Sequence, residues 1–311
     1  MNSILAICNE STNEYKKLEI FIKKLQLEEN AKEYSDYREI LYTGIINRCY
    51  SLWETFNKSI VFAYYTLIKE KLLSDNTLIS KLKLHELPGY ITEMGQYDSD
   101  KNFIYYTLKE EYITYTSKNM DINQLNVIYD RVEIRIIDEL DGNKNIKEFL
   151  TQNSIYFTTN LLADALKEII FERNASAHYA VIETFKNLNF LLKWTELYKL
   201  LLEEISIIIC NKILHYKKLL NDSIGEVKNY LEEKKVLCID LIDNVSITKE
   251  SILAVVKNNK LIDIVKPISF QVEGIKKEIA TNNDKVGIGL GPYFDRVIKI
   301  NNPSNINILL I

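Results

Sequence analysis

Glycine and proline are scarce in this chain, with only 9 and 4 residues among 311. Because both residue types interrupt helices, their scarcity favours long helices over much of the sequence. The cysteines are also few and lie far apart, at Cys8, Cys49, Cys210 and Cys238. No pair has the C-x-x-C spacing of a zinc ribbon or a redox dithiol, so we expect free, mostly buried thiols in a reducing cytoplasm.

Basic residues do not outnumber acidic residues in this chain. Lys and Arg number 39 against 43 Asp and Glu, which gives a formal net charge of −4. This balance argues against a protein that binds nucleic acid through a broad basic surface, but it allows an enzyme that holds a few phosphates locally. A composition that is 47% hydrophobic and 26% charged is typical of a folded globular protein.

Long apolar runs are absent too. The first residues contain no basic segment followed by an apolar core, so we expect no signal peptide. The most apolar helical segment, LLLEEISIIICNKIL at 200–214, is short for a membrane span and carries two glutamates. We therefore expect a cytoplasmic protein that does not cross a membrane.

Apolar residues recur at three- and four-residue steps in several segments, as they do in helices with one buried face. We expect a mixed-charge helix over 12–35 and strongly patterned helices over 37–72, 160–173 and 178–220, with Asn160 as an N-cap. The last of these has a broad apolar face, which suits a central bundle helix or a dimer interface. The expected buried positions are Ile45, Cys49, Leu52, Phe56, Ile60, Ala63, Leu67, Leu162, Leu166, Ile169, Trp194, Leu197, Leu201, Ile205 and Ile208.

After residue 225 the pattern changes to short apolar runs bounded by charged residues, which predict strands. The strand candidates are KVLCIDLID (235–243), LIDIVKPISFQVE (261–273), KVGIGLG (285–291), DRVIKI (295–300) and NINILLI (305–311). We expect TKESILAVVKN (248–258) to form a short helix, and NFIYYTLKEEYITYT (102–116) is compatible with either helix or strand. The expected fold is therefore mainly α. A helical bundle domain at 1–225, with a long insertion at about 74–155, precedes a small strand-containing α+β domain at 226–311.

The segment ERNASAHYA at 172–180 holds one of only three histidines. On one continuous helix, Arg173 and His178 would lie roughly 140° apart around the axis. We expect the helix to end at Asn174 and a new helix to be capped by Ser176, so that the two side chains meet across the junction. Ala175 and Ala177 add no bulk, so another backbone or an RNA strand could approach closely.

These residue types suit RNA cleavage without a metal. Histidine serves as acid or base near neutral pH, the forked cation of Arg173 suits two phosphate oxygens, and Asn174 can position a phosphate or the imidazole. A symmetric dimer would supply two copies of His178 around one cleft. The structural alternative is that these side chains are helix caps and charge partners, and the R-x4-H spacing alone favours that alternative.

The segment RNASAH resembles the R-x4–6-H motif of HEPN domains, in which a polar residue such as Asn often follows the arginine. Upstream, INRCYSLWETFNKSIVFAYY at 46–65 is similar to the first core helix of one HEPN type, where an aromatic–Glu pair is followed by Phe and Lys. The similarity covers about 37–73 and 155–220. In this chain the matching helix residues are Trp53, Glu54, Phe56 and Lys58.

The resemblance implies an α-helical bundle that forms homodimers, and in many members a metal-independent RNase of toxin–antitoxin, phage-defence or CRISPR systems. It assigns Arg173 and His178 to an active site at the dimer cleft, Asn174 to the adjacent polar position, and Glu54 to a polar position of the first helix near the site. The alternative for Glu54 is a surface ion pair with Lys58 at i,i+4.

The chain departs from the family pattern directly after the histidine. Some HEPN toxins carry R-x4-H-x-Tyr, in which a partner enzyme modifies the tyrosine. Here the tyrosine is Tyr179, one position too early, and Ala180 occupies the expected place. Many members instead have glycine where this chain has Tyr179. We therefore expect no regulation by that modification.

The function expected from the sequence is a metal-independent endoribonuclease with no cofactor, acting as a toxin or phage-defence effector. Its expected partners are an RNA substrate, with tRNA as one candidate, a second copy of the chain, and an antitoxin or defence-system protein. Attack by a 2′-hydroxyl would leave a 2′,3′-cyclic phosphate and a 5′-hydroxyl end. The alternatives are a non-catalytic HEPN module that binds RNA, a nucleotide or a protein, and a purely structural helical protein.

Other motifs carry little chemistry. GIGLG at 287–291 lacks the Walker lysine and the Rossmann spacing, so we expect glycines of a turn or bulge. His85 and His215 have no metal-like partners nearby in sequence, and structural or surface roles are expected for both. The tyrosine-rich stretch 105–115 is expected to pack in a core or insertion rather than to stack on bases.

Overall fold

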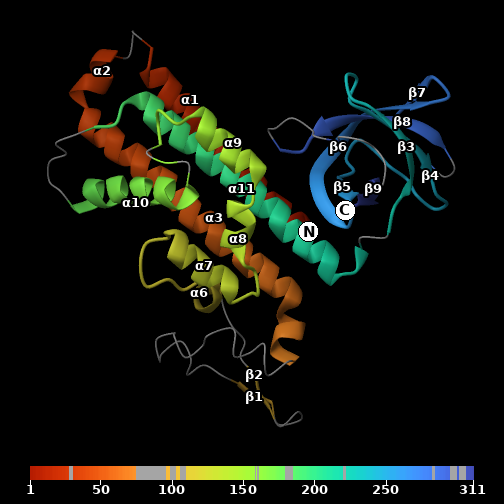
Figure 1. Cartoon of the computed structure of the whole chain (residues 1–311), viewed down its shortest axis with the longest axis horizontal. Helices are drawn as coiled ribbons and strands as arrows, with labels where there is room; N and C mark the ends of the chain where they lie inside the picture. Colours follow the sequence, from red (N-terminus) through yellow and green to blue (C-terminus); the bar gives the residue numbers. More distant parts are fainter. Residues whose placement is uncertain are drawn as a thin grey trace. The chain divides into compact units, whose positions relative to one another are not determined.

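The computed structural model contains two compact units. One is Ser3–Ser206, and the other joins Met1–Asn2 to Ile207–Ile311. The first is helical and the second carries an antiparallel sheet, so the chain is α+β overall (Figure 1). The described residues are 1–27, 31–74, 96–98, 103–105, 110–157, 159, 161–178, 185–219, 222–281, 284–294, 300 and 306–311.

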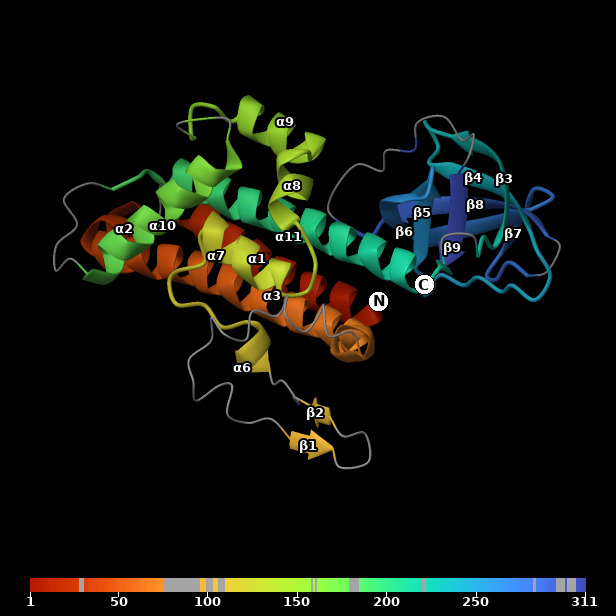
Figure 2. The ribbon, with the colours of Figure 1, turned by 60° about the horizontal axis from the view of Figure 1, so that its bottom comes forward.

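The long helices α1, α3 and α11 lie side by side in the helical unit, with α10 against α3 and the short helices α6 to α9 around them (Figure 2). The bounds are α1 Asn2–Leu25, α2 Ala31–Asp36, α3 Arg38–Ser74, α6 Glu110–Ile113, α7 Ile122–Asp130, α8 Ile136–Asp141, α9 Lys144–Gln152, α10 Leu162–His178 and α11 Leu188–Tyr216. A short antiparallel pair, β1 Gln96–Asp98 and β2 Phe103–Tyr105, lies between α3 and α6 in the chain.

Aromatic side chains from three helices form the centre of the helical core. Trp53 of α3 and Tyr15 of α1 both pack on Tyr198 of α11, with ring centroids 5.2 and 5.8 Å apart. The Tyr15 hydroxyl donates to the carbonyl of Cys49 at 2.6 Å, so its polar end is satisfied inside the core. These contacts hold α1, α3 and α11 together and fix the face of α3 that supports the candidate site.

The periodicity predicted most of this core correctly. Ile45, Cys49, Leu52, Phe56 and Ile60 are buried as expected, and so are the predicted positions of α10 and α11. Only the last two predicted positions of α3, at 63 and 67, are half-exposed. The mixed-charge helix expected over 12–35 had the wrong limits, because one helix begins at residue 2 and another at residue 31.

The start of α10 differs in detail from the expectation. Asn160, the expected N-cap, lies outside the described residues. Thr159 accepts a hydrogen bond from the Leu161 N–H at 3.2 Å and donates to Asp164 at 2.8 Å. A hydroxyl and a carboxylate at this end suit the exposed N–H groups of a first turn.

The C-terminal sheet is antiparallel and curled, with the order β3-β4-β8-β6-β5-β9 and with β7 paired to β6. The Ile224 N–H donates to the Ile308 carbonyl at 2.8 Å, which draws the two ends of the sheet together into a half-barrel. Its strands are β3 Gly225–Leu231, β4 Val236–Leu241, β5 Leu253–Lys257, β6 Lys260–Val272, β7 Ile275–Lys277, β8 Lys285–Pro292 and β9 Ile306–Leu310. One face encloses an apolar core that includes Leu237, Val255, Phe270 and Ile288.

Two hairpins of this sheet depend on residues that adopt positive φ. Asn258 and Asn259, with φ of 51° and 57°, join β5 to β6. Glu273 and Gly274, with φ of 50° and 81°, join β6 to β7. Two-residue turns with positive φ at both positions match the twist of antiparallel strands, and Asn and Gly adopt them most readily.

The apolar runs after residue 225 predicted β4, β6, β8 and β9 correctly. The expected helix at 248–258 was wrong, because its apolar centre forms β5, between β6 and β9. Residues 253–256 are all buried there, and a fully buried strand shows no alternation that would distinguish it from a short helix. The polar strand β3 was not predicted, and 295–299 of the remaining candidate lie outside the described residues.

The glycines of GIGLG lie within strand β8 rather than in a turn. A Cβ atom at Gly289 would lie 2.3 Å from the Ser269 hydroxyl, and one at Gly291 would lie 2.8 Å from Ile268. The neighbouring strand β6 has a register shift between Pro267 and Ser269 at this place. Glycine is therefore used because a bulge in the next strand approaches β8 closely.

We expect Gly225→Ala to lower the free energy of unfolding of the C-terminal unit by about 1–3 kcal/mol. A Cβ atom at Gly225 would lie 2.2 Å from the carbonyl oxygen of Asp240, and a backbone atom of a paired strand cannot rotate away. Gly287→Ala is the matched control in the same sheet, because its Cβ would make only an ordinary contact with Val236 at 3.4 Å. Thermal unfolding of both variants measures the difference, and equal midpoints would contradict the prediction.

All four cysteines are free, as expected, and Cys8, Cys49 and Cys210 are buried while Cys238 is half-buried. Burial raises the pKa of the Cys210 thiol to about 12, so this thiol stays protonated near neutral pH.

No helix among the described residues is both long enough and apolar enough to cross a membrane.

Candidate functional site

Helix α10 carries both Arg173 and His178, so the expected helix end at Asn174 was wrong. The Ser176 hydroxyl donates to the carbonyl of Arg173 at 2.8 Å, a bond within the helix and not an N-cap. Asn174 continues the helix because helix propensity disfavours it only weakly and alanines follow. The positions of Arg173 and His178 are therefore roughly 140° apart around one axis.

The side chain of His178 lies outside the described residues, and so do Tyr179 and Ala180. The part of the candidate site that the structure describes is thus the surface around Arg173 and Asn174. The chain continues after this gap at Phe185. There the ring of Phe185 packs edge-on against Tyr42 of α3, with centroids 5.1 Å apart.

Arg173 is half-buried and is held from two sides. Its guanidinium lies over the ring of Tyr50 in α3, 5.0 Å from the centroid, and Nη1 donates to Oδ1 of Asn174 at 3.2 Å. An aromatic face attracts a cation and orients its plane. The side chain is therefore positioned before any ligand arrives, which is what an anion-binding arginine requires.

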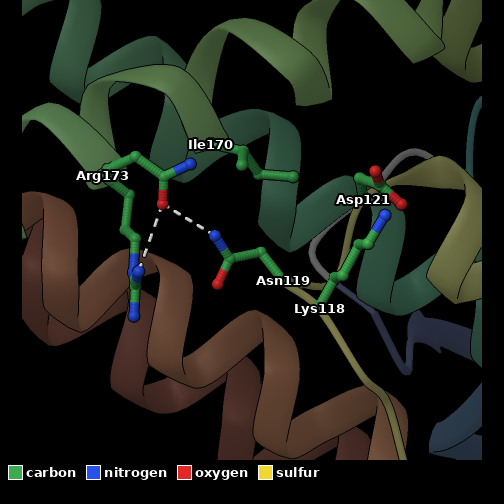
Figure 3. Close-up of a pocket in the computed structure, with 6 residues that line it drawn as sticks. Lys118, Asn119, Asp121, Ile170 and Arg173 are labelled. Atoms are coloured by element: carbon green, nitrogen blue, oxygen red, sulfur yellow. Dashed lines mark hydrogen bonds between the residues drawn. The ribbon is translucent and has the colours of Figure 1, made fainter.

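A second asparagine joins this arrangement from a distant part of the chain. Nδ2 of Asn119 donates to the same Oδ1 of Asn174 at 2.7 Å. Figure 3 shows Asn119 between Arg173 on one side and Lys118 on the other. These residues line an open hollow of about 430 Å³, together with Asp121 and Ile170.

The segment that carries Lys118 and Asn119 is fixed to α3 through the backbone of Met120. The Met120 N–H donates to the Tyr50 hydroxyl at 2.7 Å, and Nε1 of Trp53 donates to the Met120 carbonyl at 3.1 Å. Asp121 then caps α7, since its Oδ1 accepts from two N–H groups of the first turn. One helix, α3, thus supports both the arginine and the segment across the hollow.

Tyr50 is central because its ring and its hydroxyl serve different parts of the site. Burial raises the pKa of Tyr50 to about 12; the Met120 N–H and Arg173 oppose this shift, and Glu54 adds to it. The phenol is therefore neutral throughout the physiological range, and its oxygen accepts the Met120 N–H there. Tyr65 of the same helix also has a pKa of about 12, raised by burial.

We expect Tyr50→Phe to lower the free energy of unfolding by about 1–3 kcal/mol at neutral pH, because the buried Met120 N–H loses its acceptor. The raised pKa of Tyr50 also contributes about 1.4 kcal/mol per pH unit to the stability that the wild type loses as the pH rises from about 10 towards 12. Stability falls as the pH rises because the tyrosine of the unfolded chain releases its proton at a lower pH than the tyrosine of the folded chain. Tyr50→Phe lacks this contribution.

Tyr65→Phe is the matched control, because Tyr65 shares the raised pKa and is also buried. Both variants should lessen the alkaline loss, whereas only Tyr50→Phe should lower stability at neutral pH. Denaturant unfolding at several pH values measures both effects. Equal stabilities of the two variants at neutral pH would contradict the role assigned to the Tyr50 hydroxyl.

Glu54 forms the surface ion pair that was the alternative interpretation. Its carboxylate accepts from Nζ of Lys58 at 2.5 Å, and each side chain is about one-third exposed. Glu54 does not line the hollow, although its charge acts on the neighbouring Tyr50. Its assignment to the active site stays a prediction.

The other two histidines of the chain are His85 and His215. His215 is exposed in the last turn of α11, and His85 lies outside the described residues. Among the residues that the structure describes, no group of three or more His, Cys, Asp or Glu side chains is placed to hold a metal ion.

The sequence did not lead us to predict Lys118 and Asn119 as site residues, although their segment carries one recognisable local signal. Asp121 before an apolar-patterned segment is a recognisable N-cap, which marks a helix start shortly after Lys118 and Asn119. Nothing local, however, connects Asn119 with Asn174, which is 55 positions away. Comparison with protein-family models, with curated proteins and with solved structures gives no match for this chain.

Proposed function

We propose that this chain is a metal-independent endoribonuclease of the HEPN type. The observation that carries the proposal is the placement of Arg173, whose guanidinium is oriented by Tyr50 and Asn174 at the edge of an open hollow. A fixed, forked cation at such a place suits the phosphate of a flexible strand. Lys118 supplies a second positive charge to the same hollow.

In the proposed reaction, a base removes the proton of a 2′-hydroxyl and the resulting oxygen attacks the adjacent phosphorus. The bond from phosphorus to the 5′-oxygen breaks, and an acid protonates that oxygen. The products are a 2′,3′-cyclic phosphate and a 5′-hydroxyl end. Arg173 stabilises the extra negative charge on the phosphate oxygens, and His178 acts in proton transfer. Asn174 positions the phosphate, and Glu54 is the polar residue that the neighbouring helix α3 places near the site.

The reaction needs both a base and an acid, and one chain supplies one histidine in this motif. The proposal therefore includes a homodimer, in which two copies of His178 share one cleft. Support comes from α10, where Phe171 is 68% exposed two residues before Arg173, and Leu161 next to the helix start is 64% exposed. Large apolar side chains at the surface suit contact with a second copy.

The proposed setting is the cytoplasm, where the enzyme would act as a toxin or phage-defence effector on cellular RNA, with tRNA as one candidate. An antitoxin or another defence protein would hold it inactive. The C-terminal sheet would bind the RNA substrate, a partner or an inhibitor.

The test is cleavage of total RNA and of tRNA in the presence of EDTA, with the product ends mapped. We expect the wild type to cut and to leave cyclic phosphate and 5′-hydroxyl ends. His178→Ala should cut about 100-fold more slowly or not at all. Ends that carry a 3′-hydroxyl and a 5′-phosphate would contradict the mechanism, and activity lost in EDTA would contradict metal independence.

A specific observation favours a second candidate, a HEPN module that binds RNA, a nucleotide or a protein without cleavage. Because α10 is continuous, the two motif positions diverge around one axis in a single copy. If the wild type binds RNA but does not cut it, either as a monomer or as a homodimer, the binding module becomes the better interpretation.

A further inference from the structure

The amide of Asn174 has a fixed orientation, which follows from its neighbours. Arginine can only donate hydrogen bonds, so the atom of Asn174 that faces Nη1 of Arg173 must be the oxygen. The same oxygen accepts from Nδ2 of Asn119. The nitrogen of the Asn174 amide is therefore the end that remains to donate to a ligand.

The hollow consequently offers donors and positive charge to whatever enters it. Arg173 and Lys118 lie at opposite ends, with Asn119 between them (Figure 3). The carboxylate in the lining, on Asp121, directs Oδ1 into the first turn of α7, where it accepts N–H groups at 3.0 and 2.8 Å. The wall is completed by the apolar side chain of Ile170.

The size of the hollow limits what it can hold. A volume of about 430 Å³ lies at the lower end of the range of small-molecule pockets, which is roughly 300–1,000 Å³. That space exceeds the needs of one phosphate and suits one nucleotide with its ribose and base. A duplex would instead need an extended basic surface, and the net charge of −4 argues against one.

We propose that the hollow binds one unpaired nucleotide of RNA, with the phosphates on its two sides held by Arg173 and Lys118. Ile170 provides the apolar surface against the ribose or base, and the Asn174 amide donates to an acceptor of the nucleotide. Lys118 is thus a substrate-binding residue and Asn119 a positioning residue that acts through Asn174. This inference rests on the proposed function, since it concerns the RNA of the same site.

The experiment uses the full chain and a labelled single-stranded 2′-O-methyl RNA of mixed sequence, which cannot be cleaved because its 2′-oxygen cannot attack. Fluorescence anisotropy over a range of salt concentrations gives the affinity and its salt dependence. Lys118→Ala should weaken binding about tenfold at low salt and reduce the slope of log K against log salt by about 0.7. Lys118→Arg should restore most of the affinity. Lys147→Ala, which removes an exposed lysine of α9 outside the hollow, is the matched control.

Equal binding by Lys118→Ala and by Lys147→Ala would overturn the inference. It would also be overturned if a duplex of the same sequence bound as tightly as the single strand. Neither readout involves cleavage, so the two proposals can fail separately. If the wild type binds the probe through Lys118 but leaves ordinary RNA intact, this inference stands and the proposed nuclease activity is wrong. If the wild type cuts RNA while Lys118→Ala binds and cuts equally well, the proposed nuclease activity stands and this inference is wrong.

Discussion

Replacing Arg173 with alanine is expected to lower the rate of RNA cleavage in EDTA by about 100-fold or more. The guanidinium is fixed between the Tyr50 ring and Asn174, so no reorganisation is needed when charge develops on the phosphate. Arg173→Lys should recover only part of the rate, because an ammonium keeps the charge but cannot bind two phosphate oxygens in one plane. Single-turnover assays with one tRNA measure the three rates.

The same substitution should leave the fold intact. Arg173 is half-buried and its contact with Tyr50 contributes only about 0.5–1 kcal/mol, which thermal unfolding can resolve. Arg48→Ala is the matched control, since it removes an exposed arginine of α3 that pairs with Glu14 at 2.6 Å. The control should cut at the wild-type rate. Unchanged cleavage by folded Arg173→Ala would mean that the activity belongs to another site or to a contaminant.

Much of the fold was predictable because long amphipathic segments carry their own signal. The burial of Ile45, Phe56 and Ile60 along α3 follows from their spacing, which places them on one side of any helix. Strand β4 was equally predictable, because it is a short apolar run between charged residues. Such predictions need only local sequence, and they succeeded where tertiary contacts agreed with local preference.

Two errors arose where local preference was weak. The chain around Val255 and Val256 is buried between β6 and β9, and its neighbours, not its own pattern, decide that it is a strand. At Asn174 the residue type allowed either a helix end or a helix interior, and the structure has the interior. A single side chain with mixed preferences cannot decide a boundary.

The candidate site was predictable only in part. Arg173 and Asn174 were identified from their chemistry and spacing, but Lys118, Asn119 and the supporting Tyr50 were not. The hydrogen bond between Asn119 and Asn174 spans 55 positions of the chain, and the one between Met120 and Tyr50 spans 70. No local sequence pattern encodes either bond. The link is the backbone of Met120, which is buried and held at both its N–H and its carbonyl.

That link leads to the largest expected effect on stability. Trp53→Ala should lower the free energy of unfolding by about 3–5 kcal/mol, a large part of the roughly 5–15 kcal/mol that holds a folded protein together. Trp53 is fully buried, packs on Tyr198 and donates to the Met120 carbonyl. The variant leaves a large cavity and a buried carbonyl without its donor. Far-UV circular dichroism during thermal unfolding measures the loss.

A milder pair of variants separates packing from the hydrogen bond. Trp53→Phe and Trp194→Phe remove similar volumes from buried positions, but Nε1 of Trp194 has no hydrogen-bond partner among the described residues. Only Trp53→Phe frees the Met120 carbonyl, so only this variant should loosen the segment of Lys118 and weaken binding of single-stranded 2′-O-methyl RNA by a few-fold. Equal weakening in both variants would show that general core packing, and not the hydrogen bond to Met120, holds the hollow in shape.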